Sequence, residues 1–103
     1  MCIRDSFRVA PDERAQYLAE AMETMRLSRT EKGCIEYVVA PDPVEDDRVV
    51  LSERWETQAD LDKHIRDLMA RRKDATESLD EPKPVKVLSR EILFFEATPT
   101  DRP

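Results

Sequence analysis

The sequence predicts a single α+β domain, and three observations lead to this expectation. The chain has 103 residues, which is the size of one domain. In four segments apolar residues alternate with polar ones or form β-rich runs, as in strands, and in two others they recur every three to four residues, as in helices. These segments follow one another in the order strand, helix, strand, strand, helix, strand. For this order we expect two helices on one face of a four-stranded antiparallel sheet, the ferredoxin-like arrangement.

The first predicted strand ends at Val9, because Phe7 and Val9 are apolar and flank the polar Arg8. A strand of about five to six residues would have to begin within residues 1–6 (MCIRDS). This segment is polar and differs from the rest of the chain, and we expect it to be truncated or not native. The expected domain therefore spans residues 7–96.

A first helix is predicted to begin near Pro11, where the acidic residues 12 and 13 complement the positive end of the helix dipole. It runs to about Arg29. Gly33, the single glycine of the chain, is placed where a left-handed helix stop is needed. The apolar stripe of this helix consists of Ala15, Leu18, Met22 and Met25.

Two strands are predicted next, over residues 34–40 and 48–56. Prolines and a run of acidic residues separate them and make a solvated hairpin connection. In each strand one set of alternate residues should point toward the helices. That set is Ile35, Tyr37 and Val39 in the first strand, and Val49, Leu51, Glu53 and Trp55 in the second.

A second helix should begin after Thr57, which is a good N-cap residue, and should run to Arg72 or beyond. Polar residues over 74–83 and the prolines at positions 82 and 84 end it. The last strand is predicted over residues 85–96, with a bulge where the apolar parity slips, and residues 97–103 are expected to form a tail. The stripe of the second helix consists of Leu61, Ile65 and Leu68, and His64 lies within its arc.

The sheet face that points away from the helices is predicted to be apolar as well. Strand parity places Val38, Val50, Leu88 and Ile92 or their neighbours on it. Nothing in a single chain remains to cover this face. We therefore expect a homodimer in which two sheets pack face to face.

The charge balance and the absence of targeting signals exclude several classes of protein. The 17 Lys and Arg residues are outnumbered by 23 Asp and Glu residues, which gives a net charge of −6. An acidic chain is repelled by nucleic acids and by anionic membranes. No apolar run approaches the ~18 residues of a membrane span, and no signal-peptide core follows Met1. The sequence thus predicts a soluble, cytoplasmic protein that binds neither nucleic acid nor membrane.

The residues available for metal and cofactor binding are few. Cys2 and Cys34 fit no metal-binding spacing, and a single histidine cannot build a multi-histidine zinc site. The sequence has no glycine-rich phosphate loop, no dinucleotide fingerprint and no HExxH motif. We therefore expect no metal, flavin or nucleotide cofactor.

Glu53 and His64 are the candidate acid–base residues. Glu53 lies on an otherwise apolar strand face, where burial would raise the pKa of its carboxyl group. It is either an acid, base or orienting group in a pocket, or a structural carboxylate paired with Arg29 or a helix terminus. The ordinary pKa of His64 lies near neutrality, and the helical stripe turns this residue toward the sheet. It is either a general base, or a core histidine that binds a carbonyl group or Glu53.

Three further residues are candidates for substrate binding. Tyr37 and Trp55 point toward the interior and could line a pocket, although plain core packing is the alternative. Arg29 could attract an anionic substrate, and a surface or structural ion pair is its alternative role.

Four segments of the chain resemble the antibiotic biosynthesis monooxygenase family. They are residues 7–11 (FRVAP), 28–37 (SRTEKGCIEY), 53–56 (ERWE) and 59–64 (ADLDKH). The pattern SRxExGCxxY, followed by ExW and LxxH, is spaced as in the small quinol monooxygenase-like members, and the match covers about residues 7 to 96. The resemblance implies a dimeric ferredoxin-like α/β barrel with a substrate cavity between the helices and the sheet.

The family resemblance also implies a range of activities. Members include oxygenases of quinols and anthrone-type polyketides that need no metal or flavin, enzymes that degrade haem, and a branch that isomerises a phosphorylated sugar. Haem-degrading members rely on an Asn in the first strand and a ligand His in the second helix. This chain has no Asn and only one His, which removes most of the support for haem degradation.

Three hypotheses for the function follow. The first is a cofactor-independent monooxygenase of a small quinol, phenolic or polyketide-like substrate, with O2 as the second substrate. In it His64 is the base, Glu53 orients His64, and Tyr37, Trp55 and Arg29 bind the substrate. The second is an acid–base isomerase of a small (phospho)carbonyl compound, which a cluster of cations in the pocket would favour. The third is a dimer that binds a small ligand without catalysis.

Overall fold

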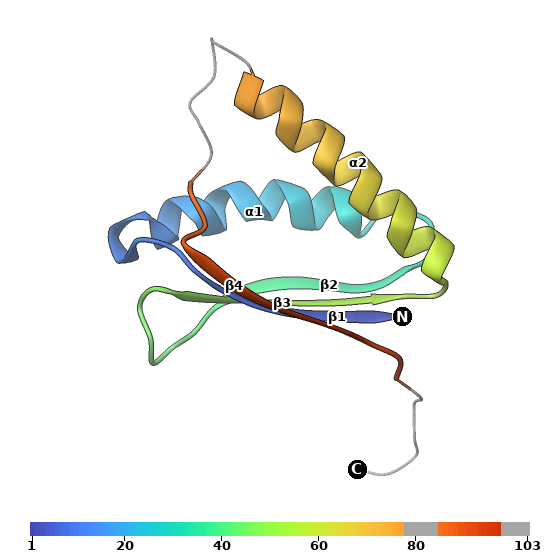
Figure 1. The fold of residues 1–103 in the computed structure, drawn as a ribbon, viewed down its shortest axis with the longest axis horizontal. Coiled ribbons are helices and arrows are strands. Elements are labelled where there is room, and N and C mark those ends of the chain that lie inside the picture. The colour runs from blue at the N-terminus through green and yellow to red at the C-terminus, as the bar shows by residue number, and fades with distance from the viewer. Residues whose placement is uncertain (78–84, 98–103) are drawn as a thin grey trace.

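A four-stranded antiparallel sheet forms one layer of the molecule, and two helices lie on one side of it (Figure 1). The computed structural model describes residues 1–77 and 85–97, apart from the side chains of residues 75–77. The strand order is β2-β3-β1-β4, which confirms the predicted α+β, ferredoxin-like fold. The elements are β1 (Cys2–Arg8), a 3-10 turn η1 (Pro11–Glu13), α1 (Arg14–Ser28), β2 (Cys34–Pro41), β3 (Arg48–Trp55), α2 (Gln58–Glu77) and β4 (Ser89–Phe95).

Strand β1 lies in the middle of the sheet, between β3 and β4. It begins at Cys2, ahead of the domain boundary expected at Phe7, and so includes most of the segment that the sequence sets apart. The backbone N–H of Trp55 donates to the carbonyl oxygen of Met1 at 2.9 Å. Ile3 and Phe7 are buried on the face that the helices cover. A strand that is paired on both sides thus begins at the second residue of the chain.

Helix α1 faces the sheet with a different stripe from the one predicted. Ala21 and Ser28 are its buried residues. Leu18 and Met25, which the prediction included, are half-buried, but Ala15 is exposed and Met22 is 47% exposed. The buried face follows the spacing of small residues instead of the largest apolar ones, because a small side chain lets the helix backbone approach the sheet closely.

Strand β2 carries an irregularity near its start. Its pairing with β3 shifts register between Cys34 and Glu36, so one residue is left over in β2. Ile35 is 51% exposed as a consequence, and the prediction that it faces the helices is wrong. Tyr37 and Val39, beyond the irregularity, do point inward: Tyr37 is buried and Val39 is half-buried.

The helix-facing residues of β3 and the start of α2 agree with the sequence. Glu53 and Trp55 are buried, and the hydroxyl group of Thr57 accepts a hydrogen bond from the N–H of Asp60 at 3.1 Å, as expected of an N-cap. Along α2 the contact with the sheet weakens, because the helix rises away from the strands toward its C-terminal end (Figure 1). Leu61 is fully buried, whereas Met69 is 56% exposed.

The turn between α1 and β2 packs against the start of α2. Gly33 adopts a positive φ of 84°, which confirms its predicted conformation. Its carbonyl oxygen accepts the N–H of Glu56 at 2.8 Å. A Cβ atom at Gly33 would overlap the carboxylate of Asp60. The glycine is therefore required both by its backbone conformation and by the closeness of α2.

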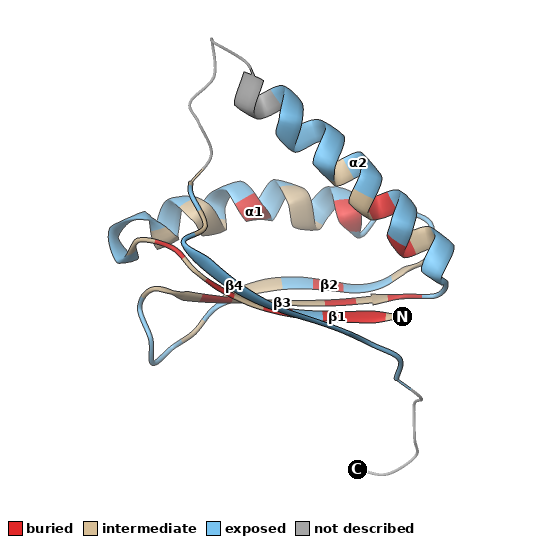
Figure 2. Ribbon diagram, in the orientation of Figure 1, coloured by how far each residue is buried: buried red, intermediate tan, exposed pale blue. Residues whose placement is uncertain are grey.

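Strand β4 is shorter than predicted and pairs regularly with β1. Ile92 lies opposite Asp5, a buried residue on the helix-facing side, so its predicted placement on the outer face is wrong. The predicted change of parity lies ahead of the strand, because Val87 and Arg90 line the same cavity. All residues of β4 are exposed (Figure 2). Helix α2 continues to Glu77, so the predicted end of the helix at residue 74 is wrong by a few residues. The rest of the predicted polar segment, residues 78–83, and residues 98–103 of the predicted tail lie outside the described residues.

The core consists of two apolar clusters and a few buried polar residues. One cluster contains Ile3, Tyr37, Trp55 and Leu61, and the other contains Phe7, Val9 and Val49. Four buried polar residues accompany these clusters, which are Asp5, Ser28, Glu53 and His64. Burial of polar side chains is costly unless they are paired, so this group marks the place where the fold departs from a purely apolar core.

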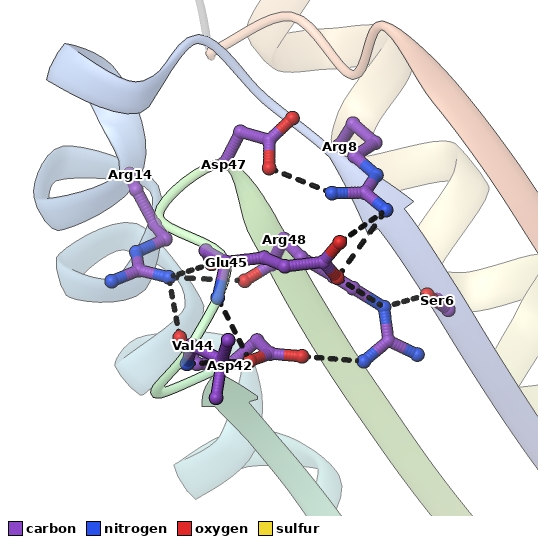
Figure 3. Close-up of polar contacts among 8 residues, drawn as sticks. All are labelled: Ser6, Arg8, Arg14, Asp42, Val44, Glu45, Asp47 and Arg48. Carbon is purple, nitrogen blue, oxygen red and sulfur yellow. Dashed lines mark hydrogen bonds and ion pairs between the residues drawn. The ribbon is translucent and has the colours of Figure 1, made fainter.

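The connection between β2 and β3 is held by a network of charged side chains (Figure 3). The carboxylate of Asp42 accepts the backbone N–H groups of Val44 and Glu45, at 2.7 Å and 3.0 Å, and pairs with Arg48 at 2.7 Å. Arg14 of α1 donates to three carbonyl oxygens of this region, among them that of Asp42 at 2.9 Å. The acidic loop is thus an ordered connection that fixes the start of α1 to the hairpin.

Candidate active site between the helices and the sheet

His64 lies near the start of α2 and points into the core. Its Nδ1 atom is 2.6 Å from a carboxylate oxygen of Glu31, in the turn after α1. Its Nε2 atom is 3.5 Å from Oε1 of Glu53, within ion-pair range. The imidazole packs against Trp55, with ring centres 4.7 Å apart, and edge-on against Tyr37 at 5.3 Å. Two carboxylates and two aromatic rings therefore enclose the imidazole.

Glu53 reaches this cluster from the helix-facing side of β3. The indole N–H of Trp55 donates to Oε1 of Glu53 at 3.0 Å. Burial raises the pKa of the Glu53 carboxyl group, and the hydrogen bond from Trp55 and the nearby His64 oppose this rise. The Glu53 carboxyl group thus lies in a low-dielectric site, where both the indole N–H of Trp55 and Nε2 of His64 approach its Oε1 atom.

The structure brings four of the five candidate residues together and leaves one apart. His64, Glu53, Tyr37 and Trp55 form the buried cluster described above. Arg29 instead donates from Nε to the carbonyl oxygen of Tyr37 at 2.9 Å, and its side chain lines a separate hollow beside β2. In this structure Arg29 acts as a backbone contact between α1 and β2.

A cavity of about 290 Å3 lies between α1, the sheet and the C-terminal half of α2. Tyr37 is the only one of the five candidate residues that lines it; neither His64 nor Glu53 does. Tyr37 therefore connects the cavity to the buried cluster. The lining residues are Phe7, Tyr17, Glu20, Ala21, Thr24, Tyr37, Val39, Leu51, Arg72, Val85, Val87 and Arg90.

The polar part of the cavity lining comes from residues that the sequence analysis did not select. Tyr17 comes from α1, Arg72 from α2 and Arg90 from β4. Burial raises the pKa of the Tyr17 and Tyr37 hydroxyl groups, so both phenols are protonated at neutral pH. The cavity thus offers neutral phenol groups together with permanently charged guanidinium groups.

Asp5 lies beneath the cavity on the central strand. It is 2% exposed, and its Oδ2 atom pairs with Nε of Arg90 at 3.0 Å. Burial raises the pKa of the Asp5 carboxyl group, while the charges of Arg90 and Arg72 lower it. The buried carboxylate therefore has a charged partner that also lines the cavity.

The sequence does contain signals for these missed residues. Asp5 shares strand parity with the buried Ile3 and Phe7, which is the signal that selected Glu53 on the neighbouring strand. Arg72 follows Leu68 by four residues and so continues the helical stripe. Arg90 could be found only from the register of β4 against β1, where it lies opposite Phe7.

Three buried polar atoms have no hydrogen-bond partner among the described residues. They are Oδ1 of Asp5, Oγ of Ser28 and Nε2 of His64. They come from β1, from the end of α1 and from α2, so all three lie in the layer between the helices and the sheet. Such atoms are rare in folded proteins and are common at functional sites.

Two further properties concern metals and membranes. Over residues 1–77 and 85–97, the structure holds no group of three His, Cys, Asp or Glu residues that is suited to bind a metal ion. Neither of the two helices in this part of the chain has the length and apolar character that crossing a membrane requires.

Comparison with known proteins gives matches in sequence and in structure. The uncharacterized protein sll1783 of Synechocystis sp. is 32% identical over 63 residues, which are 61% of this chain and 43% of that protein. The chain thus spans less than half the length of this relative.

Two similar solved structures carry the family's name. One, from Deinococcus radiodurans, has a TM-score of 0.78 at 19% identity and covers 100% of this chain and 98% of its own. The other, from Nitrosomonas europaea, has a TM-score of 0.71 at 16% identity and covers 93% and 88%. At these identities the likeness shows the fold. The sequence itself matches the antibiotic biosynthesis monooxygenase family over residues 2–69, and this chain therefore belongs to that family.

Proposed function

We propose that this chain is a cofactor-independent monooxygenase of a small quinol, phenolic or polyketide-like substrate. The observation that carries the proposal is a cavity with phenol and guanidinium groups, directly beside a buried acid–base cluster. Its volume of about 290 Å3 is near the lower end of the ~300–1,000 Å3 of ligand pockets and fits a small substrate. Membership of a family with this name supports the same reaction class.

The chemistry requires little of the protein. A deprotonated quinol or phenol is electron-rich and supplies the electrons that reduce O2. One oxygen atom enters the substrate, and the other leaves as water with two hydrogen atoms of the substrate. The guanidinium groups of Arg72 and Arg90 stabilise the oxyanion that deprotonation creates. The apolar lining keeps water away from the intermediate.

His64 is the proposed base, and Glu53 near its Nε2, together with Glu31 at its Nδ1, is proposed to orient it. A carboxylate beside an imidazole selects one tautomer of the ring. His64 does not line the cavity, whereas Tyr37 contacts both, so the proposed reaction requires a water molecule beside Tyr37 to carry the proton from the substrate to His64. Tyr37 and Trp55 hold this path in place through their ring contacts with His64.

The direct test is oxygen consumption by the purified chain with a panel of quinols and anthrones. We expect one O2 consumed for each oxidised product, with no effect of chelators. Thr24→Leu, which fills part of the cavity, should raise KM, whereas Glu23→Leu on the exposed side of the same helix should not. No consumption above the uncatalysed rate with any member of the panel would contradict the proposal.

A second candidate function is favoured by the two arginines in the cavity. An isomerase of a small phosphorylated carbonyl compound needs cations for the phosphate and an acid–base pair that moves a proton next to the carbonyl group. Arg72 and Arg90 could supply the first requirement. Exchange of the substrate's α-hydrogen with deuterated water, without consumption of O2, would identify this reaction and exclude the oxygenase.

A further inference from the structure

Two guanidinium groups meet at the cavity, although the chain is acidic overall. Arg72 and Arg90 both line it, and Glu20 is the only carboxylate among its described lining residues. The chain as a whole carries a net charge of −6. Guanidinium groups from two separate elements converge on one hollow, where they can attract an anionic group of a ligand.

Arg90 is held in a fixed direction by two residues of β1. Its Nε atom pairs with the buried carboxylate of Asp5 at 3.0 Å. Its guanidinium carbon lies over the ring of Phe7, 5.2 Å from the centre. An ion pair with a buried carboxylate is screened less by solvent than a surface pair. The position of the guanidinium group is therefore set before any ligand binds, which lowers the entropic cost of binding.

The contact with Asp5 uses Nε and leaves the outer end of Arg90 available. Arg90 makes no side-chain hydrogen bond within residues 1–77 and 85–97. Its two terminal nitrogens form the planar fork that binds carboxylate and phosphate oxygens in a bidentate manner. Arg72 approaches the same cavity from α2 and supplies a second positive charge.

The remainder of the lining fits a flat apolar body. Phe7, Tyr17 and Tyr37 contribute aromatic rings, and the rings of Phe7 and Tyr17 pack edge to face with centres 5.2 Å apart. The aliphatic lining residues are Ala21, Val39, Leu51, Val85 and Val87. A cavity of about 290 Å3 leaves space for one or two fused rings with a small substituent.

We propose that this cavity binds a small aromatic oxyanion, with the carboxylate or phosphate taken by Arg90 and Arg72 and the ring placed between Tyr17 and Tyr37. The inference rests on the proposed function, because it treats the cavity as the substrate site and assigns an anionic group to that substrate.

Equilibrium binding to the full chain tests this without turnover. The probes are 2-naphthoate, 2-naphthyl phosphate and the neutral 2-naphthamide, measured by calorimetric titration at two salt concentrations. At least one anion should bind about tenfold or more tightly than the amide, because hydrogen bonds to a charged group are the stronger ones, and added salt should weaken it. The tighter of the two anions identifies the group as carboxylate or phosphate.

The variants test separately the bidentate hydrogen-bond donors of Arg90 and the positive charges at the cavity. Arg90→Lys keeps a cation beside Asp5 but removes the bidentate donors, and Arg72→Met removes the second charge. Each should weaken binding of the anion about tenfold and leave binding of 2-naphthamide unchanged. Arg66→Met, at an exposed position of α2, is the matched control and should change neither. If Arg90→Lys does not fold, the double variant Asp5→Asn/Arg90→Met removes both charges together.

The inference is overturned if 2-naphthamide binds as tightly as the anions, if Arg66→Met weakens binding as much as Arg72→Met, or if no probe binds at millimolar concentration. Failure of the proposed function is a different result. Anions that bind as expected while no panel substrate consumes O2 would remove the monooxygenase and leave the binding site. Turnover of neutral quinols by a parent chain that binds none of the anionic probes more tightly than 2-naphthamide would remove the anion site and leave the monooxygenase.

Discussion

The imidazole of His64 is enclosed by two carboxylates and two aromatic rings. Glu31 binds one nitrogen of His64 and thereby fixes the ring, while the other nitrogen faces Glu53. The ring is therefore oriented by a residue from the turn after α1, a residue that the sequence analysis gave no role. The same imidazole contacts the ring of Trp55 at a tilt of 33° and the ring of Tyr37 in a T-shaped arrangement.

Replacing His64 tests whether it acts as a base. His64→Ala should lower turnover per folded molecule by about 10²–10⁴-fold, the usual effect of losing a positioned base. Glu53→Gln should lower it less, because an amide still orients the ring. Turnover and thermal unfolding are measured together, with Lys63→Ala at the neighbouring exposed position as the control. An unchanged turnover per folded molecule, combined with reduced stability, would make His64 a structural residue of the core.

At the residue scale, strand parity and helical spacing predict which side chains point inward, and little else. Parity placed Glu53 and Trp55 correctly, and spacing placed His64 correctly. Neither can show that Tyr37 stands between His64 and the cavity, since that depends on how far α2 lies from the sheet. Arg90 escaped prediction for the same kind of reason, because its place depends on the register of two strands far apart in the chain.

At the scale of elements, the β2–β3 connection makes stability depend on pH. The backbone N–H groups of Glu45 and Val44, together with Arg48, lower the pKa of Asp42 from 3.8 to about 2. Since the folded pKa is the lower one, the carboxylate stabilises the fold above about pH 4, and this stabilisation is lost as the pH falls toward 2.

Urea unfolding between pH 2 and pH 6 measures this dependence. Asp42→Asn should reduce the slope of the unfolding free energy against pH in the range from 4 down to 2. Asp46→Asn, at an exposed position of the same loop, is the control and should keep the slope of the parent chain. An identical slope in parent chain and Asp42→Asn would show that the network in Figure 3 contributes nothing to stability at acidic pH.

The N-cap of α2 provides a second test at this scale. Thr57→Ala removes the acceptor for the N–H of Asp60 and should lower the unfolding free energy by about 1 kcal/mol. Thr57→Ser keeps the hydroxyl group and should restore most of it. Chemical denaturation of both variants beside the parent chain decides the question; equal losses in the two would mean that the methyl group matters and the hydrogen bond does not.

Two predictions about which residues of β2 and α1 face the core were wrong, because tertiary packing overrides the local sequence pattern there. The irregularity in β2 turns Ile35 outward, although alternation alone assigns it to the core. In α1, Ala21 and Ser28 face the sheet in place of Met22. Close packing of the helix backbone on the sheet stabilises the fold more than burial of the flexible Met22 side chain would. Both outcomes depend on tertiary packing.

At the scale of the whole molecule, one face of the sheet has no helix over it. The register places Val38, Val50, Leu93 and Phe95 on this face, and three of these are more than a third exposed. We predict that a second copy covers it, so sedimentation should give about twice the 12.0 kDa of one chain. Val50→Asp should dissociate the pair, and Val44→Asp, in the exposed β2–β3 connection, should not. A monomer at micromolar concentration would contradict this prediction.

The overall arrangement was the most predictable property of this chain, since the order of strands and helices leaves few ways to cover a sheet. The inclination of α2 was not predictable. This helix leaves the sheet toward its C-terminal end, and its stripe accordingly changes from the buried Leu61 to Arg72 at the cavity. The space for a substrate thus comes from an angle between two elements, which no local pattern encodes.

The turn at Gly33 has a consequence for how this protein can change by mutation. Any side chain at this position would need both a strained backbone and a displaced Asp60, at the point where the Gly33 carbonyl also holds Glu56. Glu31, which orients His64, belongs to the same turn. A library of random variants, selected only for folding and never for activity, should therefore retain Gly33 as strictly as a library selected for turnover. Selection for the fold alone thus keeps the turn that places Glu31 beside His64, whether or not the site is used.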